Sequence, residues 1–213
     1  MQIKRFIFNP IQVNTYLIYN EQTHQAALID AGCFGHEEEE ELSRYIEEHK
    51  LKVEHLLNTH LHLDHQFGNA YVAQRYGILP KASEADEPLV SNVRQYAAAF
   101  GLDDELAKEQ PLGTYLNDGE ELDICGYKCQ IIATPGHTPG GICLYFADEK
   151  TLFTGDTLFA GGIGRADLPG GDYGTLIRSL QKKIMILPDD TKIYCGHGPN
   201  STIGEEKQMN PFL

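Results

Sequence analysis

The sequence predicts an α+β protein in which two β-sheets pack together with helices on the outside. Short β-prone segments occur in two clusters along the chain, and helical segments follow each cluster. No linker, low-complexity segment or tandem repeat separates the clusters, so residues 1–213 are expected to form a single domain. The chain has 213 residues, 41% of them apolar, which is enough for a substantial core.

The first cluster opens with three short β-prone segments that turn-forming residues separate. These segments are expected to be antiparallel strands at 3–8, 15–19 and 26–29. A helix is then predicted at 36–50, because its glutamate-rich start suits the positive end of the helix dipole. The pattern continues with a strand at 53–58 and a helix at 66–76. A further helix is predicted at 87–100, because Leu89, Val93, Ala97 and Phe100 are apolar at helical spacing.

The second cluster begins around an Asp-Gly turn at 118–119, which is expected to join two strands. Further strands are predicted at 128–133, 142–146 and 151–154. A glycine-rich loop at 159–172 leads into a helix predicted at 173–186. The last predicted strand is at 192–194.

Charge and composition disfavour several classes of binding partner and cellular location. The formal net charge of −14 disfavours binding to nucleic acid or to an anionic membrane. The opening MQIKRFIFNP has no apolar run suited to a signal peptide, and no segment has the roughly 20 apolar residues of a membrane span. The five cysteines match no zinc-ribbon spacing and are expected to be reduced and buried. We therefore expect a cytoplasmic protein, whose oligomeric state the sequence does not indicate.

The segment THLHLDH, from Thr59 to His65, places three histidines and an aspartate within six positions. Alternate side chains of an extended loop share a side, so His60 and His62 can bind one ion. Asp64 and His65 follow where the loop turns into a helix and can face a second ion. Asp64 can also be explained as a helix N-cap, but the whole cluster is typical of a site for zinc, iron or manganese.

Ligand-type side chains recur where later strands end, at His137, Asp156 and His197. Residues at strand ends can converge on one edge of a sheet, and glycines beside these three residues permit the tight turns that this requires. The remaining histidines are expected to be solvated or hydrogen-bonded residues without a metal: His24, His36, His49 and His55.

The motifs THLHLDH, TPGHTPGG, FTGDTLF and YCGHGP, in this order, resemble those of the metallo-β-lactamase superfamily. The resemblance extends from NTYLI and LIDAG to the terminal STIGEEKQMNPFL. Together with GRADLPGGDYGTLIRSL, this tail is most similar to the glyoxalase II-type hydrolases of the superfamily. The resemblance implies an αββα sandwich with its metals at one edge of the two sheets. Many antibiotic-hydrolysing members have cysteine where this chain has Asp156, which disfavours a true β-lactamase.

The resemblance also implies a dinuclear centre of two divalent ions, expected to be Zn²⁺, with iron or manganese as alternatives. Asp64 would orient the nucleophile and carry its proton, in addition to binding metal. Bound metal lowers the pKa of water to about 7, and a thiolate leaves with little protonation, so hydrolysis of a thioester suits such a site. The first metal would be held by His60, His62 and His137, the second by Asp64, His65 and His197, and Asp156 would bridge them.

The expected substrate is a small anionic thioester such as S-lactoylglutathione. The chain ends soon after His197, so we expect it to lack the C-terminal helical extension with which glyoxalase II enzymes bind glutathione. Arg165 is the candidate partner of a substrate carboxylate, and Tyr173 is a second substrate-binding candidate. Their structural alternatives are a surface pair of Arg165 with Asp167 and a tyrosine that opens the predicted helix.

Two other functions compete with thioester hydrolysis. Gly164-Arg165-Ala166-Asp167 resembles the Gly-Arg-x-Asp stretch of persulfide dioxygenases, which use one iron through residues matching His60, His137 and Asp156. A metal-binding module without enzymatic activity is the third hypothesis.

Overall fold

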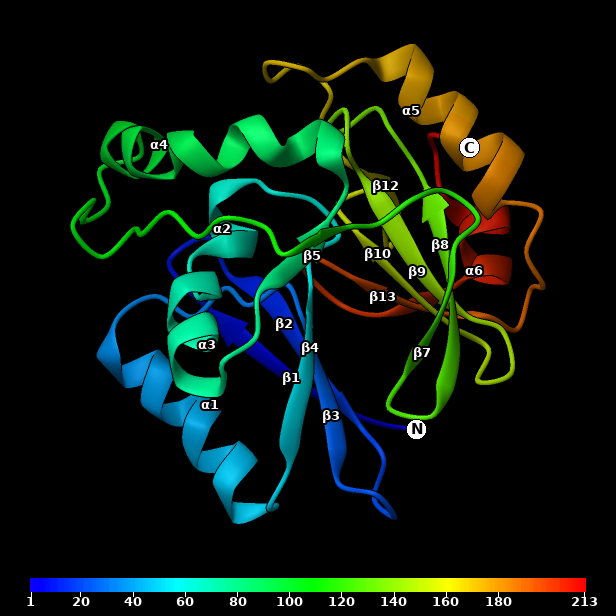
Figure 1. Cartoon of the computed structure of the whole chain (residues 1–213). Coiled ribbons are helices and arrows are strands. Elements are labelled where there is room, and N and C mark those ends of the chain that lie inside the picture. The colour runs from blue at the N-terminus through cyan, green and yellow to red at the C-terminus, as the bar shows by residue number, and fades with distance from the viewer.

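Two six-stranded β-sheets lie face to face between layers of helices in the computed structural model, which describes all residues from Met1 to Leu213 (Figure 1). The order of strands is β1-β2-β3-β4-β5-β6 in the first sheet and β14-β13-β10-β9-β8-β7 in the second. The predicted α+β class and αββα arrangement are therefore confirmed.

The first sheet begins with three antiparallel strands and continues with three parallel ones. Neighbouring residues of a strand face opposite sides. Tyr16 and Ile18 accordingly pack against the second sheet, whereas Leu17 packs toward the helices. The strands are β1 (Gln2–Phe8), β2 (Val13–Tyr19), β3 (Gln25–Ile29), β4 (Lys52–Leu57), β5 (Pro80–Ala82) and β6 (Thr114–Tyr115).

The second sheet is antiparallel except where β10 pairs with β13. Every residue of β9 and β10 is buried, since these central strands are covered on both faces. Its strands are β7 (Glu121–Ile124), β8 (Tyr127–Ala133), β9 (Ile142–Phe146), β10 (Thr151–Gly155), β13 (Lys192–Cys195) and β14 (Ser201–Thr202). A small hairpin of β11 (Leu158–Phe159) and β12 (Gly162–Ile163) follows β10.

Three apolar layers hold the sandwich together, one between the sheets and one under the helices of each side. The first sheet is covered by α1 (His36–Glu48) and α3 (Asn69–Tyr76), with α2 (Leu63–Gln66) near its upper end (Figure 1). The second sheet is covered by α5 (Tyr173–Ser179), a turn of π-helix, η2 (Leu180–Ile184), and α6 (Ile203–Met209).

The predicted helix at 87–100 differs in its first half. Residues Glu84–Asn92 form a 3₁₀ segment, η1, and only Val93–Ala99 form the α-helix α4. Pro88 lies inside η1 and has no N–H to donate to an α-helical hydrogen bond. Together η1 and α4 cross the top of the sandwich in Figure 1.

The predicted helix at 66–76 begins later, as α3 at Asn69, and Gly68 separates it from the short helix α2, which ends at Gln66. A Cβ at Gly68 would lie 2.4 Å from the Cys33 Sγ, so tertiary packing sets the geometry of this break. The predicted helix at 173–186 is α5 continued by η2. Strands β5, β6, β11, β12 and β14 and helix α6 have no counterpart among the predicted elements.

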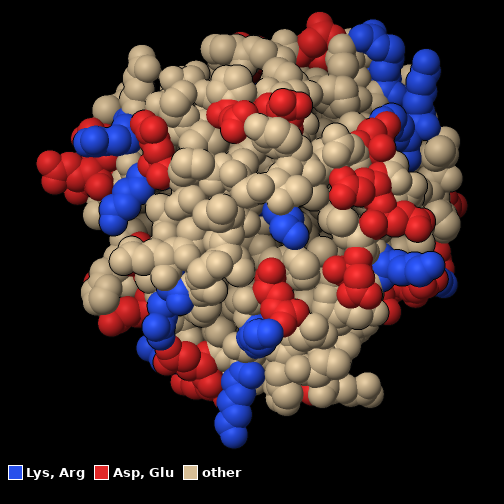
Figure 2. Space-filling view, in the orientation of Figure 1, with Lys and Arg blue, Asp and Glu red and all other residues tan.

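All five cysteines are free and buried, as expected. No helix combines the length and apolar character that crossing a membrane requires. Figure 2 shows acidic and basic side chains interspersed on one face of the molecule, without a continuous basic patch.

Candidate metal centre

The seven predicted metal ligands lie together where four strands end at the same edge of the sandwich. His60 and His62 follow β4, and His137 follows β8. Asp156 comes directly after β10, and His197 comes after β13. Strands of both sheets therefore contribute to one centre, although the ligands are spread over most of the sequence.

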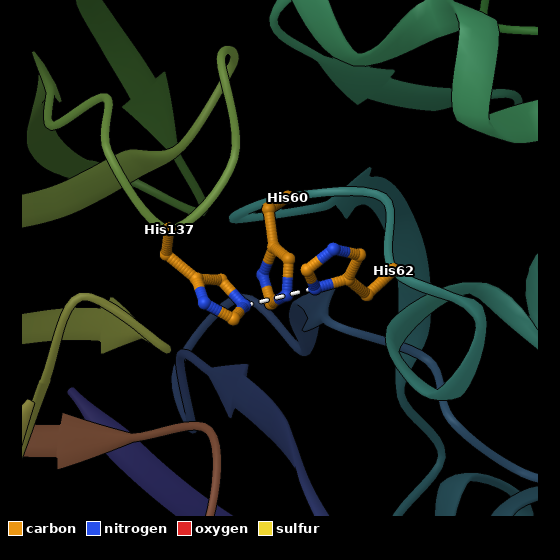
Figure 3. Close-up of side chains that lie close together, drawn as sticks. All are labelled: His60, His62 and His137. Carbon is orange, nitrogen blue, oxygen red and sulfur yellow. Dashed lines mark hydrogen bonds between the residues drawn. The ribbon is translucent and has the colours of Figure 1, made fainter. Parts of the chain in front are cut away.

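His60, His62 and His137 form a first group, whose ligand atoms all lie within 4.8 Å of one another. Figure 3 shows the three rings converging from the loops after β4 and β8. The His62 Nδ1 and the His137 Nε2 are 2.8 Å apart. The His60 Nε2 is buried in the same place and has no hydrogen-bond partner.

Asp64, His65 and His197 form a second group. The Asp64 Oδ2 lies 3.1 Å from the His197 Nε2 and 3.5 Å from the His65 Nε2. Asp64 lies in the first turn of α2 and makes no capping hydrogen bond. The alternative that Asp64 serves as the N-cap is therefore wrong.

Asp156 lies between the two groups and reaches both with its carboxylate. Its Oδ1 is 3.3 Å from the His65 Nε2, and its Oδ2 is 3.6 Å from the His137 Nε2 and 3.7 Å from the His197 Nε2. This close approach requires glycine at position 196, because a Cβ there would be 2.1 Å from the Asp156 Oδ1. The Asp156 carboxylate is therefore within reach of both groups, and its role as a bridging ligand stays a prediction.

The donor set fits divalent metal ions. The His60 Nε2, the His65 Nε2 and the Asp156 Oδ1 are buried without any hydrogen-bond partner. Unpaired buried polar atoms are costly, and folded proteins rarely keep them without a function. Imidazole nitrogens and carboxylate oxygens are suitable ligands for zinc, iron and manganese.

Hydrogen bonds behind the rings orient three of the histidines. The Nδ1 of His137 donates to the Arg165 carbonyl at 2.7 Å, and the Nδ1 of His197 donates to the Gln12 carbonyl at 3.1 Å. The Nδ1 of His65 donates to the Asp30 Oδ2 at 3.0 Å. In each ring the Nε2 then remains available to a metal.

Asp30 is a functional candidate that the sequence analysis missed. It is buried, and its carboxylate also accepts hydrogen bonds from the Thr59 N–H at 2.7 Å and the Thr59 Oγ1 at 2.6 Å. Asp30 can be grouped with His60 and His65 as a third ligand set. Both of its oxygens already have donors, however, so its role here is to orient His65 and the ligand loop. The sequence feature that could have indicated Asp30 is its position directly after β3, within LIDAG.

Asp86 is a second missed residue, and it ties η1 to two ligand loops. Its buried carboxylate accepts from the Leu61 N–H at 3.2 Å, the Gly140 N–H at 2.6 Å and the Thr138 Oγ1 at 2.8 Å. Leu61 lies between His60 and His62, while Thr138 follows His137. Nothing in the local sequence marked Asp86, because its three partners come from distant segments.

The surroundings of the centre lower the pKa of two candidate ligand histidines, His60 and His62, and raise the pKa of two others, His65 and His197. Burial, reinforced by the neighbouring histidines, lowers the pKa of His60, and burial and His137 lower the pKa of His62 to about 4. Burial would also lower the pKa of His65, but Asp64, Asp156 and Asp30 outweigh it and raise that pKa. Neutral His60 and His62 keep the lone pairs that bind metal.

A cleft opens beside the centre, and its walls are largely apolar. Its lining includes His62, Asp64, His137, Asp156 and His197 at the base, together with Ile11, Leu61, Leu63, Leu89, Tyr96, Phe100, Arg165, Leu168 and Pro169.

Arg165 lines the cleft, but Tyr173 does not and is exposed at the start of α5. The Arg165 guanidinium makes two hydrogen bonds to Asp167, at 2.7 and 2.8 Å, as its structural alternative predicted. Of the other histidines, His36 pairs with Glu40, His49 contacts the Tyr45 carbonyl, and neither belongs to the centre. His24 and His55 also lie outside the candidate ligand groups.

Comparison with known proteins assigns this chain and its fold to one family. The model of the metallo-β-lactamase superfamily matches residues 8–197, and the chain belongs to this superfamily. It is a metallo-hydrolase that is similar to glyoxalase II-type enzymes. Hydroxyacylglutathione hydrolase GloC of Haemophilus influenzae is 40% identical over 214 residues, covering 100% of this chain and 98% of the relative. The probable metallo-hydrolase YqgX of Bacillus subtilis is 31% identical over 213 residues, with coverages of 100% and 98%.

Solved structures agree with this assignment. The BLEG-1 B3 metallo-β-lactamase superposes with a TM-score of 0.90 at 32% identity, covering 100% of this chain and 99% of the other. TTHA1623 in a di-iron-bound form gives 0.87 at 33% identity, with coverages of 99% and 100%. ETHE1 from Myxococcus xanthus gives 0.80 at 27% identity, with coverages of 99% and 84%.

Proposed function

We propose that the protein is a dinuclear, zinc-dependent hydrolase of a thioester, either S-lactoylglutathione or a related acyl-thiol. The observation that carries the proposal is the cluster of seven candidate ligand side chains, Asp156 and the six around it, of which five line an open cleft. Similarity to a hydroxyacylglutathione hydrolase along the whole chain supports the thioester. Similarity to a di-iron protein supports two ions, with iron as the alternative metal.

The residues of the chain divide the work between holding metal and handling the nucleophile. Bound divalent ions would supply a water activated at neutral pH and a Lewis acid for the carbonyl. His60, His62 and His137 would hold one ion, and Asp64, His65 and His197 the other. Asp64 is at the base of the cleft, where its carboxylate can orient the attacking water and accept its proton.

Arg165 is proposed to bind a carboxylate of the substrate. Its guanidinium is at the exposed part of the cleft, and its ion pair with Asp167 is solvent-accessible. Exposed ion pairs contribute little to stability, so Arg165 can exchange Asp167 for a substrate carboxylate at small cost. Tyr173 is a weaker candidate for substrate binding, since it is outside the cleft lining.

The test is hydrolysis of S-lactoylglutathione by zinc-loaded protein, measured through the release of free thiol. We expect turnover in the wild type and a loss of at least about 100-fold in Asp64→Asn, measured at matched metal content. The exposed Asp148→Asn is the matched control and should retain activity. Metal-loaded protein that leaves every thioester of a small panel intact would exclude the proposed reaction.

A persulfide dioxygenase is the second candidate, and the segment Gly164–Asp167 favours it. Similarity to ETHE1 from Myxococcus xanthus is compatible with this alternative. It requires one iron, held by His60, His137 and Asp156. Oxygen consumption by iron-loaded protein with glutathione persulfide, in the absence of thioesterase activity with zinc, would support it over hydrolysis.

A further inference from the structure

We propose that the cleft contains a built apolar subsite, which selects thioesters with an aliphatic or aromatic group next to the scissile carbonyl. This inference rests on the proposed thioesterase function and adds the chemical class of the substituent. It follows from the apolar side chains on two walls of the cleft and from the scarcity of charged side chains on these walls.

The first wall is the segment formed by η1 and α4. Leu89, Tyr96 and Phe100 line the cleft, while Val93 and Ala97 of the same segment are buried in the core. Phe100 remains 58% exposed although it is a large apolar side chain. Accessible apolar side chains that line a cleft together are typical of a binding surface.

Hydrogen bonds connect this wall to the loops that carry the candidate ligands. Asp86 of η1 accepts hydrogen bonds from the loops of His60 and His137, as described above. Gln66 donates to the carbonyls of Leu61 at 2.6 Å and Leu89 at 3.4 Å. The apolar side chains are therefore held in a fixed relation to the reacting atoms, which is a requirement for selectivity.

The second wall is Leu168 and Pro169, in the loop that also carries Arg165. Arg165 is the only cationic side chain of the lysine and arginine type that lines the cleft, and Asp167 pairs with it. The lining carboxylates, Asp64 and Asp156, face the histidines. Apart from the centre and Arg165, the lining thus offers a substrate mainly apolar side chains, so a polar acyl group such as lactoyl gains little there.

The experiment compares S-acetyl-, S-butanoyl- and S-hexanoylglutathione on zinc-loaded protein, with S-lactoylglutathione as reference. If the acyl group occupies the subsite, kcat/KM should rise about two- to fourfold for each added methylene. A second series, acetyl thioesters of ethane-, butane- and hexanethiol, tests whether the thiol side occupies it instead. A rise in one series assigns the side, and flat profiles in both series overturn the proposal.

Variants of the two walls connect the preference to these residues. Phe100→Ala and Leu168→Ala should each lower the ratio of kcat/KM between the longest and the shortest substrate of the responding series by about threefold or more. Phe212→Ala, an exposed aromatic residue outside the cleft lining, is the matched control and should keep the wild-type ratio. Unchanged ratios in both wall variants would contradict the assignment of the walls.

A binding measurement separates the subsite from the reaction. Straight-chain carboxylates from acetate to hexanoate can be titrated into zinc-loaded protein by calorimetry, which requires no turnover. The dissociation constant should fall with chain length in the wild type and fall less in Phe100→Ala. If no thioester is hydrolysed but this trend is present, the proposed reaction fails and the subsite stands. If thioesters are hydrolysed without any such trend, the subsite fails and the reaction stands.

Discussion

At the scale of single residues, close packing around the candidate ligands also constrains this centre. Gly196 is the clearest case, because the Asp156 Oδ1 and the His65 Cε1 lie only 2.1 and 2.7 Å from the position that a Cβ would take. The sequence indicated the ligands through their chemical type. The sequence also indicated that glycines would flank the candidate ligands. Only the fold shows that Gly196 is the glycine in contact with Asp156, the proposed bridge.

Gly196→Ala should therefore displace Asp156 and weaken both metal sites together. We expect metal affinity to fall by about 10- to 100-fold, the range seen when contacts around metal ligands are disturbed. Competition with a chromogenic chelator measures this change. Gly162→Ala is the control, since the nearest atom to its new Cβ is 3.9 Å away, and its affinity should match that of the wild type.

Asp30 gives a second prediction at this scale. Asp30→Asn keeps the shape of the side chain but removes the charge that accepts from the His65 Nδ1 and from Thr59. Zinc affinity should fall by about 10- to 100-fold while the fold, followed by circular dichroism, is retained. The exposed Asp148→Asn serves as control. An unaltered affinity would mean that Asp30 supports only the local backbone and does not orient His65.

At the scale of elements, the loops that follow β4 and β8 are joined to one another by one buried side chain of η1, Asp86. The sequence analysis expected a continuous helix here with one apolar face of Leu89, Val93, Ala97 and Phe100. The structure divides this face, because Val93 and Ala97 enter the core while Leu89 and Phe100 line the cleft. Helical periodicity marks apolar positions but does not distinguish a core from a cleft.

Asp86→Ala tests this connection between elements. The substitution would leave the Leu61 and Gly140 amides and the Thr138 hydroxyl without their acceptor in a buried place. The free energy of unfolding should fall by about 2–4 kcal/mol, because unsatisfied buried donors are costly. Chemical denaturation measures the loss, and Glu84→Ala, an exposed acid of the same segment, should change stability by less than about 0.5 kcal/mol. Zinc affinity should weaken in Asp86→Ala alone, whereas a stability loss with intact affinity would limit Asp86 to a structural role.

At the scale of the whole molecule, much of the architecture could be predicted, since strands and ligand motifs are both local patterns. Two clusters of strands indicated two sheets, and the strand-end motifs indicated where the metals would lie. Short strands such as β5 (Pro80–Ala82) and β6 (Thr114–Tyr115) were missed because three or two residues carry no measurable alternation. Asp30 and Asp86 were missed for a different reason, as their importance depends on partners that only the tertiary fold brings near.

The centre also joins the two sheets, so metal should stabilise the whole sandwich and not merely the ligand loops. His60 and His62 extend from the first sheet, whereas His137, Asp156 and His197 extend from the second. An ion bound only by the folded protein at about 100 times its dissociation constant adds about 2.7 kcal/mol. For a domain of this size, that corresponds to a rise in Tm of about 5–10 °C. Scanning calorimetry of chelated and zinc-loaded protein measures this difference, with metal analysis expected to give two ions per chain.

Asp156→Ala should lose most of the zinc-dependent rise in Tm because the proposed bridge is gone, while Asp148→Asn should keep it. Equal melting temperatures with and without zinc in the wild type would mean that the centre does not tie the sheets together.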